Sequence, residues 1–97
     1  MNLIYTFDKN VNTDKHKIEV LKSYYFNSML SAKERGYTTE IYTNCDWFDT
    51  YVDIKHDVNK EFTFWDAYKT IPLFRNDDYM LVDGDVIFHN KLPKLDN

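Results

Sequence analysis

Two aspartates near the end of the sequence carry its clearest chemistry. Asp83 and Asp85 are separated by Gly84 and directly follow the apolar run 79–82. A buried strand that ends in two carboxylates places negative charge beside an apolar edge, which costs free energy unless a cation or hydrogen-bond donors compensate it. Hard divalent cations are commonly held by one or two carboxylates together with substrate phosphates. The pattern therefore predicts a metal site at a strand end, although Asp and Gly also form ordinary turns.

The first half of the chain predicts a unit that would position such a site. Residues 3–7 and 39–43 are short runs rich in β-favouring residues. Between them, apolar residues recur every three or four positions from 18 to 32, after Asp14 as a suitable N-cap and before Gly36 as a helix stop. Strand, helix, glycine and strand in this order indicate a βαβ unit with parallel strands and a right-handed crossover.

The second half predicts shorter elements. Asn44 is a candidate N-cap for a short helix, and residues 52–54 form a candidate short strand. The spacing of apolar residues from 62 to 74 predicts another helix, with Pro72 disturbing it or marking its last turn. The apolar run 79–82 then predicts the strand that leads into the two aspartates.

These elements together predict the fold class. We expect one domain over residues 1–97, of the α/β class, with a Rossmann-like, mostly parallel open sheet and flanking helices. Ligands bind such sheets at the carboxyl ends of the strands, which is where Asp83 and Asp85 would lie.

Composition excludes several classes of protein. The 97 residues are 43% hydrophobic, and 12 basic against 16 acidic residues give a net charge of −4 without a basic run, which disfavours nucleic-acid and anionic-membrane partners. The lone Cys45 forms neither an internal disulfide nor a thiolate metal cage. Apolar stretches are far below the roughly 20 residues of a membrane span, and residues 1–8 lack the pattern of a secretory signal. We expect a cytoplasmic protein without a membrane span.

The sequence resembles GT-A glycosyltransferases, most closely the bacterial and viral enzymes that build surface polysaccharides. Residues 79–88, followed by Leu92 and Pro93, are similar to the D-x-D segment of that family. Further similar segments occur in the family's order: the strand 3–7, the helix 17–35, the strand 40–43 and the aromatic, lysine-containing stretch 64–69. The resemblance covers nearly all of the chain, and the D-x-D segment is its most specific part.

The resemblance implies transfer of a sugar from a nucleotide-diphosphate donor. It implies that Asp85 ligates Mn²⁺ or Mg²⁺ bridging the diphosphate, and that Asp83 contacts the donor ribose or sugar, or the metal through water. It also places four residues beside the donor: Thr6, Phe7 and Asp8 against the base and ribose, and Lys69 at the phosphate or sugar. On this basis Asp85→Ala is expected to abolish Mn²⁺-dependent donor binding and to leave the fold intact.

Family members normally carry their acceptor site and catalytic base after the D-x-D segment, whereas only residues 86–97 follow it here. The chain therefore resembles the donor-binding half of such an enzyme, and the catalytic residues are unknown from this sequence. We expect the aromatic residues of the central third to form core, or to cover a surface that self-association or a partner chain would bury. These residues are Trp47, Phe48, Tyr51, Phe62, Phe64, Trp65 and Tyr68.

Two other interpretations stay open. Asp83 and Asp85 also resemble the first motif of haloacid-dehalogenase-like phosphatases, as nucleophile and general acid, but that family carries the motif near its amino terminus. The chain is alternatively a non-catalytic structural or interaction module, which need not bind a nucleotide sugar or a metal. Among the lesser candidates, we expect His56 at the surface and Cys45 as a small buried residue or an idle thiol.

Overall fold

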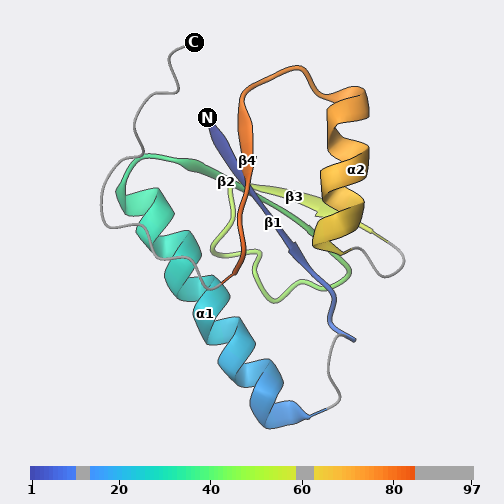
Figure 1. The fold of residues 1–97 in the computed structure, drawn as a ribbon. Coiled ribbons are helices and arrows are strands. Elements are labelled where there is room, and N and C mark those ends of the chain that lie inside the picture. Colours follow the sequence, from blue (N-terminus) through green and yellow to red (C-terminus); the bar gives the residue numbers. More distant parts are fainter. Residues whose placement is uncertain (11–13, 59–62, 85–97) are drawn as a thin grey trace.

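The computed structural model describes residues 1–10, 14–58 and 63–84 (Figure 1). The elements in this part are β1 (Asn2–Phe7), α1 (Lys15–Glu34), β2 (Thr38–Thr43), β3 (Ile54–Asp57), α2 (Phe64–Phe74) and β4 (Tyr79–Leu81). The strands form one sheet in the order β3-β2-β1-β4, and every neighbouring pair is parallel. Helices α1 and α2 lie on opposite faces of the sheet. The expected α/β class and parallel sheet are confirmed.

Helix α1 begins and ends where its sequence predicts. The carboxylate Oδ1 of Asp14 accepts hydrogen bonds from the backbone N–H groups of His16 at 2.9 Å and Lys17 at 3.4 Å, as an N-cap does. At the other end Gly36 adopts a φ of 84°, a left-handed conformation that favours glycine, and its N–H donates to the carbonyl of Lys33 at 2.9 Å. The predicted βαβ unit is confirmed.

The core lies on both faces of the two central strands. Successive side chains of a strand point to opposite faces, so Leu3, Tyr5 and Phe7 face α1 whereas Ile4 packs against Ala67 of α2. Strands covered on both faces are buried along their length, as β1 and β2 are after their first residues. Each large apolar side chain buried in this way contributes about 1.5–3 kcal/mol.

The segment after β2 differs from the prediction. Residues 44–51 form consecutive turns, and the expected short helix capped by Asn44 is wrong. The Asn44 side chain bonds to the end of β1 instead: its Nδ2 donates to Asp8 at 2.7 Å, and its Oδ1 accepts from the N–H of Lys9 at 2.9 Å. An amide that joins two strand ends is not free to cap a helix.

Strand β3 begins at Ile54, two residues later than expected. The carboxylate of Asp53 explains the shift, because its Oδ2 accepts from the backbone N–H of Thr39 at 2.8 Å and from the Thr39 hydroxyl at 3.2 Å. The hydrogen bond from the Thr39 N–H lowers the pKa of Asp53, and the nearby Lys33 lowers it further. The backbone N–H of Asp53 also donates to the carbonyl of Thr39 at 3.0 Å, so Asp53 joins the start of β3 to β2.

Helix α2 begins at Phe64 because Thr63 and Asp66 form a capping box in front of it. Pro72 lies in the last turn, which is one of the two predicted positions. The expectation that the aromatic residues form core is wrong for Trp65 and Tyr68, which are 66% and 60% exposed. Among the described residues, no helix combines the length and the apolar character needed to cross a membrane.

Candidate functional site

The carboxyl ends of the strands bring the candidate donor residues to one edge of the sheet. From β1 the chain moves outward to β2 and β3, and then returns past β1 to β4 on its other side. The direction of winding thus reverses between β1 and β4, the position at which open α/β sheets bind ligands. Asp8 directly follows β1, and Asp83 follows β4 by one residue, Val82. Both aspartates therefore flank the reversal.

Pairing continues beyond the last residue of β4. The N–H of Val82 donates to the carbonyl of Ile4 at 2.9 Å, so Asp83 follows a segment that is still bonded to β1. Asp83 is exposed and Asp8 is half-buried, whereas Thr6 is buried beneath this edge. The structure therefore places Thr6, Asp8 and Asp83 at the same end of neighbouring strands.

The ring of Phe7 belongs to the core. Its centroid lies 5.0 Å from that of Tyr25, 5.7 Å from that of Trp47 and 4.9 Å from that of Phe48, and the residue is 4% exposed. Edge-to-face contacts of this kind add to the free energy of burying the ring. The backbone of Phe7, and not its ring, is the part that a ligand at this edge would meet.

Tyr25 of α1 fills the space behind the reversal. Its hydroxyl donates to the carbonyl of Thr6 at 2.7 Å, and its ring lies against the backbone of Gly84. A Cβ at position 84 would lie 2.1 Å from Cε1 of Tyr25, so glycine is required there by the packing of helix against strand end. The absence of a side chain at Gly84 thus permits the close approach of the Tyr25 ring.

A hollow of about 620 Å³ opens at the carboxyl edge of the sheet, over the ends of β1, β2 and β3. Its lining is mainly polar and consists of Lys9, Asn44, Cys45, Asp46, Trp47, Lys55, Asp57 and Val58. Lys55 pairs with Asp49 at 3.0 Å and with Asp57 at 3.3 Å. Cys45, expected as a buried or idle thiol, is half-buried, and its Sγ lies 3.2 Å from the hydroxyl of Thr43.

One predicted site residue, Lys69, is not brought to this edge, and another, Asp85, lies outside the described residues. Lys69 is exposed on α2, and helical spacing turns it away from Ala67 and Ile71, which face the sheet. Asp85 lies outside the described residues, as do His89 and the apolar residues 86–88. Within the part of the chain that is described, no three or more His, Cys, Asp or Glu residues are grouped so as to hold a metal ion.

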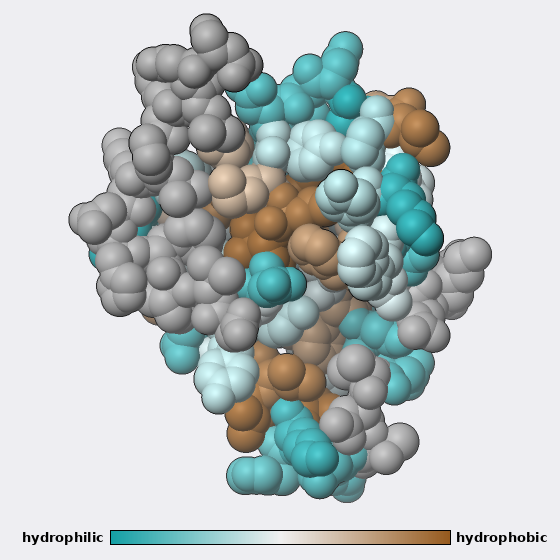
Figure 2. Space-filling view, viewed as in Figure 1, coloured by the Kyte–Doolittle hydropathy of each residue, from teal (hydrophilic) through white to brown (hydrophobic). Residues whose placement is uncertain are grey.

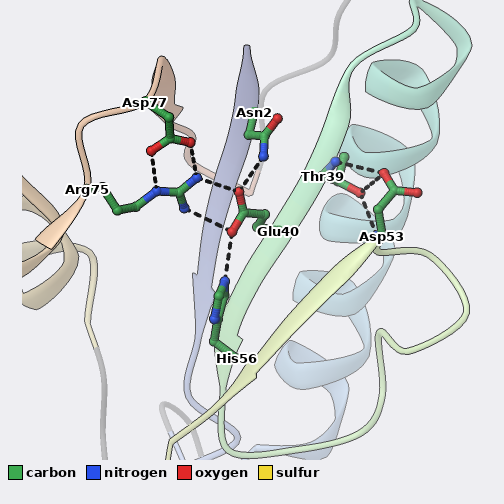
Figure 3. Close-up of polar contacts among 7 residues, drawn as sticks. All are labelled: Asn2, Thr39, Glu40, Asp53, His56, Arg75 and Asp77. Carbon is green, nitrogen blue, oxygen red and sulfur yellow. Dashed lines mark hydrogen bonds and ion pairs between the residues drawn. The ribbon is translucent and has the colours of Figure 1, made fainter.

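A second polar cluster lies on the α2 face, toward the amino ends of the strands (Figure 3). Glu40 of β2 is 2% exposed at its side chain, and both carboxylate oxygens bond to Arg75 at 2.9 Å. Asn2 donates to Glu40 at 2.7 Å, and Nε2 of His56 lies 2.7 Å from it. Arg75 also pairs with Asp77. His56, expected at the surface, is partly exposed there and also contacts the buried Glu40.

This cluster stabilises the fold, and few of its polar groups are left to bind a ligand. Burial raises the pKa of Glu40, but the hydrogen bonds from Arg75, His56 and Asn2 outweigh burial and hold that pKa below its ordinary value. No buried side-chain nitrogen or oxygen in the described structure lacks a hydrogen-bond partner. The ion pair joins the end of α2 to the middle of the sheet, just before the chain enters β4.

Comparisons of the chain with protein-family models, curated proteins and solved structures found no match. The assignment of a function therefore rests on the geometry of the carboxyl edge of the sheet. The lining of the hollow includes three residues that the sequence analysis did not identify as site candidates: Lys9, Asn44 and Trp47. Each of them follows a predicted strand within four residues, and that position was the signal that could have identified them.

Proposed function

We propose that the chain binds a nucleotide-diphosphate sugar together with a divalent cation at the carboxyl edge of its sheet, as the donor-binding domain of a glycosyltransferase. The observation that carries the proposal is the placement of Asp83 beside the end of β1, at the reversal of the sheet. A hollow of about 620 Å³ lies at the same edge, over the ends of β1, β2 and β3. Sites for small molecules and cofactors are typically about 300–1,000 Å³. The resemblance to GT-A enzymes supports the same assignment.

The lining of the hollow suits a nucleotide. The indole ring of Trp47 forms part of the lining, and a base can pack against it. The Nζ atom of Lys22, a residue of α1, lies 4.8 Å from the centroid of this ring. Lys9 supplies positive charge for phosphate oxygens, whereas the charge of Lys55 is balanced by Asp49 and Asp57. Asn44, held by Asp8, keeps the ends of β1 and β2 in fixed positions, so that binding does not have to order them.

The chemistry of the aspartates fits Mn²⁺ or Mg²⁺. Asp83 and Asp85, two residues apart in the sequence, would supply carboxylate oxygens, and the donor diphosphate would supply the others. When bound, the cation offsets phosphate charge and stabilises the diphosphate as a leaving group. Tyr25 contacts both Thr6 and Gly84, and it would thereby hold the ends of β1 and β4 in position for the ligand. Transfer to an acceptor would then require groups from a partner or from a further part of the protein.

Calorimetric titration of the whole chain with UDP and GDP, each with and without Mn²⁺, tests the proposal. We expect saturable binding that depends on Mn²⁺. Asp83→Asn removes one charge at nearly constant size and is expected to weaken binding at least about tenfold, or about 1.4 kcal/mol. Asp78→Asn is the matched control, because Asp78 is also exposed but precedes β4 at the opposite edge. That variant should bind like the wild type.

Two results would contradict the proposal. A folded chain that binds neither nucleotide in the presence of Mn²⁺ would favour the non-catalytic module. Equal losses in Asp83→Asn and Asp78→Asn would show that general charge, and not the carboxylate at the reversal, governs binding. Circular dichroism of each variant establishes that the fold is retained.

A further inference from the structure

The outer edge of β4 presents unpaired backbone groups. The N–H of Asn2 donates to the carbonyl of Asp78 at 3.3 Å, and the N–H of Val82 donates to that of Ile4, so Asp78 and Val82 point toward β1. Alternate residues of a parallel strand point to opposite sides. The N–H and C=O groups of Tyr79 and Leu81 therefore point outward. No strand of the described structure pairs with this edge.

An apolar groove runs along the same edge. Phe64, Tyr68 and Pro72 lie in one row along α2 and form a groove of about 590 Å³ with the side chains of Tyr79 and Leu81. This row is displaced around the helix from Ala67 and Ile71, which face the sheet. Figure 2, which views the molecule from the β4 side, shows hydrophobic surface where Figure 1 draws β4. The apolar residues of α2 thus extend around the helix beyond those that the sheet covers.

The two edges of the sheet differ in chemistry. On β3, Lys55 forms ion pairs with Asp49 and Asp57, and such charges discourage another strand from pairing. The sequence of β4 is Tyr-Met-Leu, without charge or proline. Tyr68 lines the groove beside it and is mostly exposed, and the exposed ring of Trp65 lies 6.0 Å from that of Tyr68. An uncharged strand edge next to exposed aromatic rings is suited to pairing with another polypeptide.

We propose that a second copy of this chain occupies this surface, through antiparallel pairing of the two β4 strands about a two-fold axis. Such an arrangement is self-complementary: centred on Met80, it sets the outward groups of Tyr79 against those of Leu81 in the partner copy, so that each N–H faces a carbonyl. Both α2 helices then lie on the same face of a continuous sheet. The aromatic rings of each copy fill the space between the helices.

The area available suits a weak dimer. An aromatic side chain covers about 150–250 Å², so Trp65 and Tyr68, about two-thirds exposed, contribute about 200–300 Å² from each copy. The half-buried groove residues Phe64, Tyr79 and Leu81 and the outward backbone groups of β4 add to this area. Stable complexes bury about 800 Å² per partner, and weak ones less than about 600 Å². We therefore expect a dimer that dissociates in the micromolar range. This proposal does not rest on donor binding.

Sedimentation of the full chain from about 1 to about 200 µM tests the proposal. The wild type should shift from monomer to dimer over this range. Tyr68→Glu places a charge in the groove, and Trp65→Glu places one beside the ring of Tyr68. Each should weaken dimerisation at least about tenfold. Leu73→Glu is the matched control, because Leu73 is 83% exposed but lies on the far side of α2 from Tyr68. It should leave the dimer unchanged.

Amide hydrogen exchange supplies a second, independent readout. The amides of Tyr79 and Leu81 should become protected as the protein concentration rises, whereas those of Met80 and Val82, which point toward β1, should be protected at all concentrations. A chain that stays monomeric at every concentration overturns the proposal, as does an equal effect of Leu73→Glu and Tyr68→Glu. Open-ended assembly in place of a dimer also overturns it, because a two-fold contact closes on itself.

Discussion

Replacement of Arg75 by methionine is expected to destabilise the protein strongly, although Arg75 lies far from the proposed donor site. Its guanidinium meets both oxygens of Glu40 at 2.9 Å, and the Glu40 side chain is 2% exposed. Methionine keeps much of the apolar volume of the arginine stem and removes only the charge and the donors. The substitution therefore leaves a buried carboxylate whose remaining partners are Asn2 and His56.

The expected loss follows from that unpaired charge. Removing one partner of a buried ion pair costs about 3–5 kcal/mol, because the other charge stays buried without compensation. Since Asn2 and His56 still bond to Glu40, we expect the lower end, about 3 kcal/mol. A domain of this kind is stable by about 5–15 kcal/mol in total, so the variant should still fold. The contact of Arg75 with the exposed Asp77 adds little, because exposed pairs are weak.

Urea unfolding near pH 7, followed by tryptophan fluorescence, measures the free energy of unfolding. The control is the double variant Glu40→Gln with Arg75→Met, which removes both charges and keeps an amide for Asn2 and His56. It should recover about 1–2 kcal/mol of the loss. A loss below about 1 kcal/mol in Arg75→Met, or no recovery in the double variant, would show that Glu40 does not need its charge balanced.

Two further predictions concern Glu40 and Gly84. Because the pKa of Glu40 is lower in the folded chain than in the unfolded one, its contribution to stability is present above the unfolded pKa of about 4.3 and is lost as pH falls through the folded value. Urea midpoints of Glu40→Gln should therefore fall less steeply with acidification than those of the wild type, and parallel curves would refute this assignment. Gly84→Ala should cost about 1–3 kcal/mol because its Cβ would lie 2.1 Å from Cε1 of Tyr25. Gly36→Ala, with nothing within 4 Å of the added Cβ, should cost about 1 kcal/mol for its backbone conformation alone. An unchanged free energy of unfolding in Gly84→Ala would contradict the close packing of Tyr25 against Gly84.

Local signals predicted the elements that they control. Asp14 and Gly36 marked the ends of α1 because capping depends on a few neighbouring backbone groups. The same reasoning failed at Asn44, whose side chain bonds to Asp8, 36 residues away in the sequence. A competing partner at that distance leaves no local trace. The exposure of Trp65 was likewise not predictable, because it depends on which flank of α2 the sheet covers.

The sequence by itself determined the α/β class, the parallel pairing of the first two strands and the position of acidic residues after an apolar strand. These features follow from periodicity, capping and turn chemistry, which act over a few residues. Only the tertiary structure decided that β4 lies beside β1 and not at the β3 edge, and that choice brings Asp83 to the end of β1. It also decided that Glu40 is buried among polar partners from three other segments of the chain. Strand order and buried ion pairs depend on contacts between distant parts of the chain, and these form only when both faces of the sheet are covered.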